Sequence, residues 1–203
     1  MRSGATRKRS ARRIALTGGI ASGKTVVASI LRKLGLVVVE ADEIAHQVLT
    51  EPEVKQQIAR AFGAAVFGTD GEVDRRALGA VVFGDPAKLR LLESITHPLI
   101  LQRIHQQEEE ALAAGKTVVS VIPLLFEKGL ERCYDRVWAT YAPKEVCLKR
   151  LQDRDGLEPD GAATRLAAQM DPAEKAARAD AVIETHCAME DLREKVTELV
   201  RTL

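Results

Sequence analysis

The chain has 203 residues, a hydrophobic content of 46% and a formal net charge of +1 at pH 7. This length allows one α/β domain with an insertion, or two small lobes that share a site, and we expect a single domain. The near-neutral charge argues against a nucleic-acid partner, because dedicated nucleic-acid binders normally carry a basic surplus. No apolar stretch approaches the roughly 20 residues that cross a bilayer, so we expect no membrane partner.

The first 39 residues contain nine Lys or Arg and no acidic residue. Over residues 1–11 we predict a disordered, solvated basic tail. A polybasic arm for RNA or membrane and an Arg-rich targeting start are the alternatives. The odd number of cysteines, with no CxxC pair, suits a reducing compartment, and we predict a soluble cytoplasmic protein.

Short apolar runs alternate with stretches of helical periodicity along the chain. Strands are predicted at residues 12–17, 36–39, 117–122, 136–140 and 181–183. Between the second and third strands the chain reads as helical throughout, with Pro86 opening one helix and Pro98 another. A crossover needs only a dozen or so residues, so the excess predicts a helical substrate-binding insertion at about 41–116.

Beyond the fourth strand, a helix over 143–153 precedes a polar segment at 154–160, and helices then resume. A polar segment between two helices predicts a small mobile lid at about 152–162. The alternation of strands and helices predicts an α/β fold, a parallel five-stranded sheet flanked by helices. We predict a single domain over residues 12–203, whose core is formed by residues 12–40 and 117–203.

The stretch GGIASGKT, Gly18 to Thr25, follows the first predicted strand and fits the P-loop pattern G-x-x-x-x-G-K-[ST]. Glycines let backbone N–H groups turn around a phosphate, Lys24 supplies a positive charge, and Thr25 offers a hydroxyl to Mg²⁺. A glycine-rich turn with an exposed lysine is the alternative, but it leaves the Lys-Thr pair unexplained. The loop predicts nucleotide contacts by Gly19, Ile20, Ala21, Ser22, Gly23, Lys24, Thr25 and Val26.

Other P-loop classes fit less well. Switch GTPases need an Asn-Lys-x-Asp element and a D-x-x-G segment, but the sequence contains no asparagine, and its third strand runs into Pro123. A motor or AAA-type ATPase would show an apolar run ending in Asp-Glu, which is absent. The class that fits this size is a small-molecule kinase.

A kinase also needs a group that orients or deprotonates the acceptor hydroxyl. Glu40 and Asp42 follow the second predicted strand, and such groups gather at the carboxyl ends of strands in open α/β sheets. Asp42 also fits the N-cap of a helix that starts at Glu43. Next to a P-loop strand, we favour the catalytic role.

Seven stretches resemble the dephospho-CoA kinase family in order and spacing, and the resemblance spans about residues 12–200. They are ALTGGIASGKT, VVVEADEIAHQV, DRRALGAVVFGDP, LLESITHPLI, IPLLFE, LKRLQDRD and ADAVIE. The resemblance implies transfer of the γ-phosphate of ATP to the ribose 3′-hydroxyl of dephospho-CoA, with Mg²⁺. It implies that Asp42 is the catalytic base, Lys24 the phosphate-binding lysine and Thr25 the metal-side hydroxyl.

Two arginines at the predicted lid, Arg150 and Arg154, are four residues apart and share one helical face. We predict that Arg154 acts on the transferring phosphoryl group and that Arg150 contacts the nucleotide, because a guanidinium suits spread charge. An ion pair with Asp153 or Asp155 is the alternative.

Acceptor contacts are predicted for Arg76, with Arg75 beside it, for His97, and for Leu124 and Phe126. The arginines could instead face water. His97 could cap the helix that Pro98 opens, and the apolar pair could belong to the core. Glu127, next to Phe126, could be a surface charge.

Three positions depart from the family pattern. Ala21 stands where many relatives have Gly, and we expect little harm. Glu40 replaces a usual Asp, and Thr185 stands where the family usually has Asn, which weakens any assignment of adenine contacts. A kinase for another small hydroxyl acceptor, such as a nucleoside monophosphate, and a non-catalytic nucleotide-binding regulator are the alternative functions. We expect a monomer or small homo-oligomer.

Overall fold

The computed structural model describes residues 11–203, which divide into two compact units. Unit 1 combines residues 11–39 with 108–203, and unit 2 is formed by residues 40–107. Apart from Ala11, the predicted basic tail lies outside the described residues. None of the described helices is long and apolar enough to cross a membrane.

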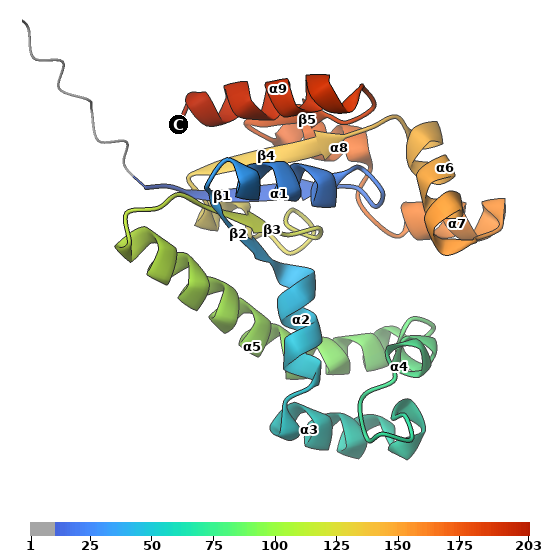
Figure 1. The fold of residues 1–203 in the computed structure, drawn as a ribbon. Helices are drawn as coiled ribbons and strands as arrows, with labels where there is room; N and C mark the ends of the chain where they lie inside the picture. The colour runs from blue at the N-terminus through green and yellow to red at the C-terminus, as the bar shows by residue number, and fades with distance from the viewer. Residues whose placement is uncertain (1–10) are drawn as a thin grey trace, which may run out of the picture. The chain divides into compact units, whose positions relative to one another are not determined.

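Unit 1 is built on a five-stranded sheet in the order β2-β3-β1-β4-β5 (Figure 1). Its strands are β1 (Arg13–Gly18), β2 (Val37–Glu40), β3 (Val118–Val121), β4 (Arg136–Tyr141) and β5 (Ala181–Glu184). All are parallel, and in the register Leu16 lies opposite both Val121 and Trp138. The predicted α/β fold with a parallel five-stranded sheet is confirmed, and β1 is its central strand.

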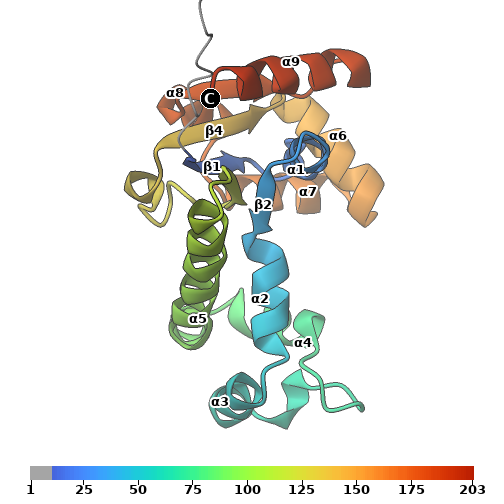
Figure 2. The same cartoon turned by 60° about the vertical axis from the view of Figure 1, so that its left-hand side comes forward.

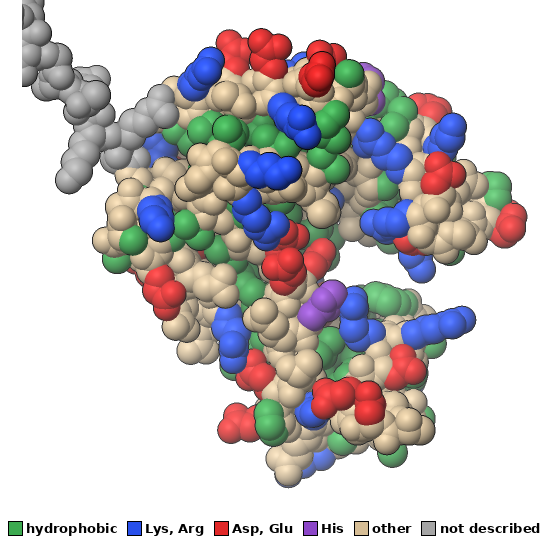
Figure 3. Space-filling view, in the orientation of Figure 1, with side chains coloured by type: hydrophobic (Ala, Val, Ile, Leu, Met, Phe, Trp, Pro, Cys, Tyr) green, Lys and Arg blue, Asp and Glu red, His purple; other side chains and the backbone are tan. Residues whose placement is uncertain are grey.

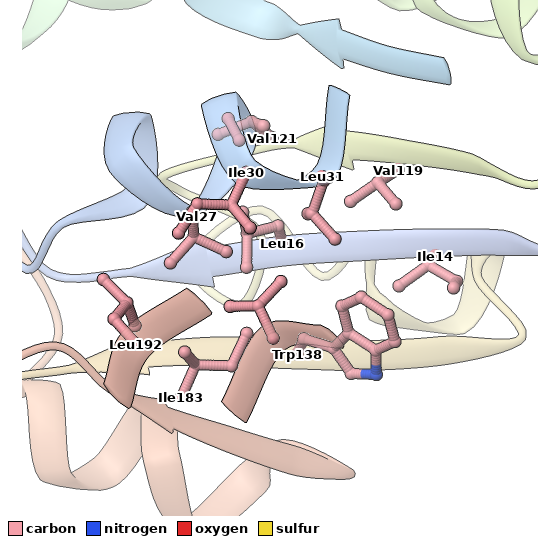
Figure 4. Packing of buried hydrophobic residues seen from close by; sticks show 12 residues of the cluster. Ile14, Leu16, Val27, Ile30, Leu31, Val119, Val121, Trp138, Ile183 and Leu192 are labelled. Carbon is pink, nitrogen blue, oxygen red and sulfur yellow. The ribbon is translucent and has the colours of Figure 1, made fainter. Parts of the chain in front are cut away.

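The helices of unit 1 cover both faces of this sheet. They are α1 (Lys24–Lys33), α6 (Lys144–Asp155), α7 (Pro159–Ala167), α8 (Pro172–Arg178) and α9 (Met189–Arg201), with a 3₁₀ turn η2 (Glu131–Cys133). Side chains alternate along a strand, so Ile14 and Leu16 face α1 and α9, where they pack with Trp138 (Figure 4). Thr17 points to the opposite face, which α8 covers.

A buried polar cluster ties the end of a long helix, α5 (Pro86–Ala113), to this opposite face. The Glu108 carboxylate is 3% exposed and accepts hydrogen bonds from Ser120 Oγ at 2.5 Å and the Tyr134 hydroxyl at 2.9 Å. Arg13 Nε lies 3.2 Å from the same carboxylate. Burial, together with this negative charge, raises the pKa of Tyr134, so its hydroxyl stays protonated and remains a donor.

Unit 2 is helical and contains α2 (Ala41–Leu49), α3 (Pro52–Phe62), the 3₁₀ turn η1 (Ala64–Val66) and α4 (Arg75–Val82), which precede α5 (Figure 2). Each α-helix before α5 buries two apolar side chains four residues apart, which places them on one face. These pairs are Ile44 and Val48, Val54 and Ile58, and Leu78 and Val82. The helix α5 belongs to unit 2 up to residue 107 and to unit 1 beyond it.

The prediction that Pro98 opens a separate helix is wrong, because α5 runs through Pro98 without a break. A proline inside a helix removes one backbone hydrogen bond and crowds the preceding turn. In a helix of 28 residues, the hydrogen bonds of the turns on either side can sustain the element. The alternative that His97 caps a helix is therefore also wrong, since no helix begins there.

Removing the buried carboxylate should destabilise unit 1. We expect Glu108→Ala to lower the free energy of unfolding by about 3 kcal/mol, because Arg13 loses its buried partner. The measurement is urea unfolding followed by the fluorescence of Trp138, the chain's single tryptophan, which is buried. The exposed neighbour Glu109, which pairs with Arg13 at the surface, is the control, and Glu109→Ala should cost less than about 1 kcal/mol. Equal losses would contradict the assignment.

Candidate active site

The loop between β1 and α1 adopts a shape that only glycine allows at two positions. Gly18 has a φ of 147° and Gly23 a φ of 92°. A Cβ at Gly18 would lie 2.2 Å from Thr140 Oγ1, and one at Gly23 would lie 3.0 Å from Thr185 Cβ. The loop backbone therefore packs directly against these two threonines, with no room for side chains.

Ala21 carries a positive φ without being glycine. Its φ of 58° is in the left-handed region, and it is the one non-glycine residue among residues 11–203 for which a positive φ is found. A Cβ in this region costs roughly 1–2 kcal/mol. The Cβ of Ala21 therefore places local strain in the loop.

Buried hydroxyl groups hold the loop from the side of the sheet. Ser22 Oγ and Thr140 Oγ1 are 2.6 Å apart, and Thr185 Oγ1 donates to the carbonyl oxygen of Ser22 at 2.7 Å. All three side chains are buried. The helix α1 starts directly after the loop, and the N-terminus of a helix favours a bound anion. This geometry fits a phosphate-binding loop.

The ammonium group of Lys24 lies across the loop. Its Nζ donates to the carbonyl oxygens of Gly18 at 3.0 Å and Gly19 at 2.8 Å. Thr25 follows as the second residue of α1 and is exposed. The positive charge and the hydroxyl are thus both set at the start of one helix, as the P-loop pattern predicts.

Arg150 reaches from α6 to the back of the same loop. Its guanidinium donates to the carbonyl oxygen of Thr185 at 2.7 Å, to Thr185 Oγ1 at 3.2 Å and to the carbonyl oxygen of Ala21 at 3.4 Å. Thr185 joins the end of β5 to Ser22 and Arg150. Its role in supporting the loop was not found from the sequence. The predicted nucleotide contact of Arg150 stays a prediction.

The predicted lid corresponds to the end of α6, residues 156–158 and the start of α7. The two helices pack through Leu151 and Leu166, and Ile20 of the phosphate loop packs against this cluster. Positive and negative side chains alternate over their outer surface (Figure 3). The helices of this predicted lid thus pack against the phosphate loop.

Arg154 is held in a surface ion pair within this lid. Its Nε lies 2.7 Å from Asp155 Oδ1, and Arg165 approaches the other oxygen of Asp155 at 2.8 Å. The Arg154 guanidinium holds the pKa of the Asp155 carboxyl below its ordinary value. The ion-pair alternative therefore describes this structure, and the catalytic role of Arg154 stays a prediction.

Asp42 lies in unit 2, in the first turn of α2, and is exposed. The alternative that it caps this helix is wrong: the helix begins at Ala41, its N-cap is Glu40, and no side chain caps it. Asp42 is the second residue of the helix because β2 runs into α2 without a loop. Helix capping therefore does not explain why an aspartate stands at position 42.

The other predicted acceptor contacts of unit 2 lie on α4 and α5. Arg75 and Arg76 are exposed at the start of α4, where Asp74 caps the helix by accepting from the Arg76 N–H at 2.8 Å. His97 is half-buried within α5. Their contacts with an acceptor stay predictions.

The segment after β3 divides its side chains between core and surface. Leu124 is exposed, whereas Phe126 is buried, with the Arg178 guanidinium 4.4 Å from its ring centre. Glu127 is not a free surface charge, because Lys175 Nζ lies 2.8 Å from its carboxylate. Lys175 is fully buried and was missed in the sequence, where it reads as one more polar residue of a helix.

No group of three or more His, Cys, Asp or Glu within residues 11–203 could hold a metal ion by itself. Mg²⁺ usually keeps several waters and takes one or two protein ligands plus substrate phosphates. A site with the single hydroxyl of Thr25 beside a phosphate loop fits Mg²⁺ that arrives with a nucleotide.

A parallel sheet with this loop after its central strand, together with a helical second unit, defines a P-loop small-molecule kinase. The family model for dephospho-CoA kinase matches residues 12–191, and the chain belongs to this family. A dephospho-CoA kinase of Carboxydothermus hydrogenoformans is 41% identical over 190 residues, which cover 93% of this chain and 92% of that relative.

Two solved structures agree with this assignment. A dephospho-CoA kinase from Campylobacter jejuni has a TM-score of 0.71 and 31% identity, covering 93% of this chain and 95% of that one. A Thermus thermophilus protein has a TM-score of 0.82 and 36% identity, covering 96% of this chain and 99% of that one.

Relieving the strain at Ala21 should stabilise the protein. We expect Ala21→Gly to raise the free energy of unfolding by about 0.5–1 kcal/mol, since the removed Cβ strain exceeds the added entropy of the unfolded chain. Thermal unfolding measures this change. The matched control is Gly18→Ala, which should destabilise the protein because its Cβ meets Thr140. A lower melting temperature for Ala21→Gly would contradict the left-handed geometry.

Proposed function

We propose that this chain transfers the γ-phosphoryl group of ATP to the ribose 3′-hydroxyl of dephospho-CoA, giving CoA and ADP. The observation that carries the proposal is the match to the dephospho-CoA kinase family over residues 12–191, which includes the complete phosphate loop. The alternatives, a kinase for another small hydroxyl acceptor and a non-catalytic regulator, have no comparable support.

The phosphate loop is proposed to hold the triphosphate of ATP. Residues 19–26 would surround it, the loop amides that are not bonded within this segment and the Lys24 ammonium would bind its oxygens, and the Thr25 hydroxyl would hold Mg²⁺. When bound, Mg²⁺ supplies charge neutralisation on the phosphates. The position of Lys24 supports this role, because its ammonium lies over the loop and donates to the carbonyl oxygens of Gly18 and Gly19.

Asp42 is proposed as the general base. It would accept the proton of the 3′-hydroxyl while that oxygen bonds to the γ-phosphorus, and the bond from the γ-phosphorus to the bridging oxygen of ADP would break. Its exposure and its position at the carboxyl end of β2 support this role. Arg154, released from Asp155, would neutralise charge on the transferring group.

Unit 2 is proposed to receive dephospho-CoA, with Arg76 and His97 as candidate contacts, and Leu124 as a candidate contact from unit 1. Phe126 is better explained as core, since it is buried. The three cysteines, Cys133, Cys147 and Cys187, carry free thiols, which fits a cytoplasmic location. A monomer or small homo-oligomer stays our expectation.

The acceptor specificity tests the proposed function directly. ADP release from ATP and Mg²⁺ should be fast with dephospho-CoA and near background with AMP, CMP or shikimate. Faster turnover with another acceptor would replace the proposed substrate. Binding of ATP without turnover on any acceptor would favour the regulator.

The role of Asp42 is tested by Asp42→Asn, which keeps the size of the side chain but removes the base. We expect kcat to fall by about 10² or more, while the Kd for ATP measured by calorimetry changes little. The adjacent exposed residue Glu43 provides the control, and Glu43→Gln should keep near-normal kcat. Normal turnover in Asp42→Asn would remove Asp42 from the mechanism.

A further inference from the structure

Lys175, in the short helix α8, places an amino group in the protein interior, where lysine side chains are rarely found. Its side chain is fully buried, and Nζ donates to the carbonyl oxygen of Pro123 at 2.6 Å and pairs with Glu127 Oε1 at 2.8 Å. A buried ion pair is costly to desolvate, and an apolar pair of similar size is often as stable. Stability alone therefore gives little reason for a lysine here.

The two acceptors of Lys175 connect it to three parts of unit 1. The Pro123 carbonyl oxygen also accepts from Thr17 Oγ1 at 3.3 Å, and Thr17 is the residue of β1 directly before the phosphate loop. Glu127 Oε1 also accepts from the Met170 N–H at 3.1 Å. Met170 lies between α7 and α8, where the chain leaves the lid. One ammonium thus joins the loop entry, the exit of β3 and the lid connection.

The first residue of α8 makes a further contact with the phosphate loop. A Cβ at Gly19 would lie 2.9 Å from Pro172 Cγ, so α8 packs directly on the loop backbone. In the sheet register Leu16 lies opposite Val121, so Pro123 follows β3 beside the end of β1. Ligands of open α/β sheets bind at these carboxyl ends.

Glu127 is ionised in this arrangement. Burial alone would raise the pKa of Glu127, but the Lys175 ammonium and the backbone N–H groups of Met170 and Glu127 itself hold it below its ordinary value. A charged carboxylate therefore faces Lys175 Nζ at 2.8 Å.

We propose that Lys175 is a positioning residue for phosphoryl transfer. Its ammonium fixes Pro123 and Glu127, and through them the backbone around the phosphate loop and the connection of the lid. This inference rests on the proposed function, because the loop it supports is the one assigned to ATP. Lys175 itself is buried and acts without touching a substrate.

The test is the double variant Lys175→Met/Glu127→Gln, which removes both charges, so that no buried charge is left unpaired and the net charge is unchanged. We expect the free energy of unfolding of the double variant to lie close to that of the wild type, because replacing both partners of a buried pair is nearly neutral. We expect kcat to fall about 10- to 100-fold, with the KM for ATP within about twofold. A wild-type kcat in the stable double variant would overturn the proposal.

Hydrogen exchange provides a readout that does not depend on turnover. The Met170 amide should exchange faster in the double variant than in the wild type, since its acceptor is no longer fixed by Lys175. Unchanged exchange at Met170 would contradict the coupling of Lys175 to the lid connection. The control is the exposed pair Lys55 and Glu72, 2.7 Å apart in unit 2, whose double variant Lys55→Met/Glu72→Gln should keep normal kcat and Met170 exchange.

If the double variant does not fold, the single variant Lys175→Arg tests the proposal. The larger guanidinium keeps the charge but displaces the Pro123 carbonyl, so kcat should fall about tenfold in a folded protein. A wild-type kcat in Lys175→Arg would overturn the proposal. The wild-type protein is assayed with dephospho-CoA in parallel. An inactive wild type would refute the proposed function. An active wild type with an equally active variant would refute only the role of Lys175.

Discussion

The close packing of the phosphate loop against Thr140 and Thr185 is the constraint on which the site depends. Gly18 and Gly23 allow the backbone to approach these side chains, and the threonine hydroxyls bond to the loop on its inner side. These contacts hold the loop backbone against buried hydroxyl groups of unit 1. A loop backbone positioned before binding suits phosphoryl transfer, a reaction that asks the protein mainly for positioning and charge neutralisation.

Support for this loop comes from elements that are far apart in the sequence. Arg150 contacts the loop from α6, and Thr185 contacts it from the end of β5. The helix α8 packs on Gly19. Lys175 of the same helix fixes the neighbouring segment after β3. The elements on both sides of the predicted lid thus contact the phosphate loop.

The sequence predicted the features that local chemistry determines. Apolar runs located all five strands, and the glycines with Lys24 and Thr25 located the phosphate loop. Pro98 was misread, because proline often begins a helix but can also be carried within a long one. Lys175 could not be found, since lysine is almost never buried unless it is paired. Its partner carbonyl, from Pro123, lies 52 residues earlier in the chain.

The central claim is that the loop after β1 binds the triphosphate through its amides and Lys24. A crystal structure with Mg²⁺ and a non-hydrolysable ATP analogue tests it most directly. The account predicts phosphates within the loop of residues 18–25, with Lys24 Nζ at hydrogen-bond distance from the outer phosphate oxygens. Phosphates bound elsewhere, with Lys24 Nζ away from their oxygens, would contradict it.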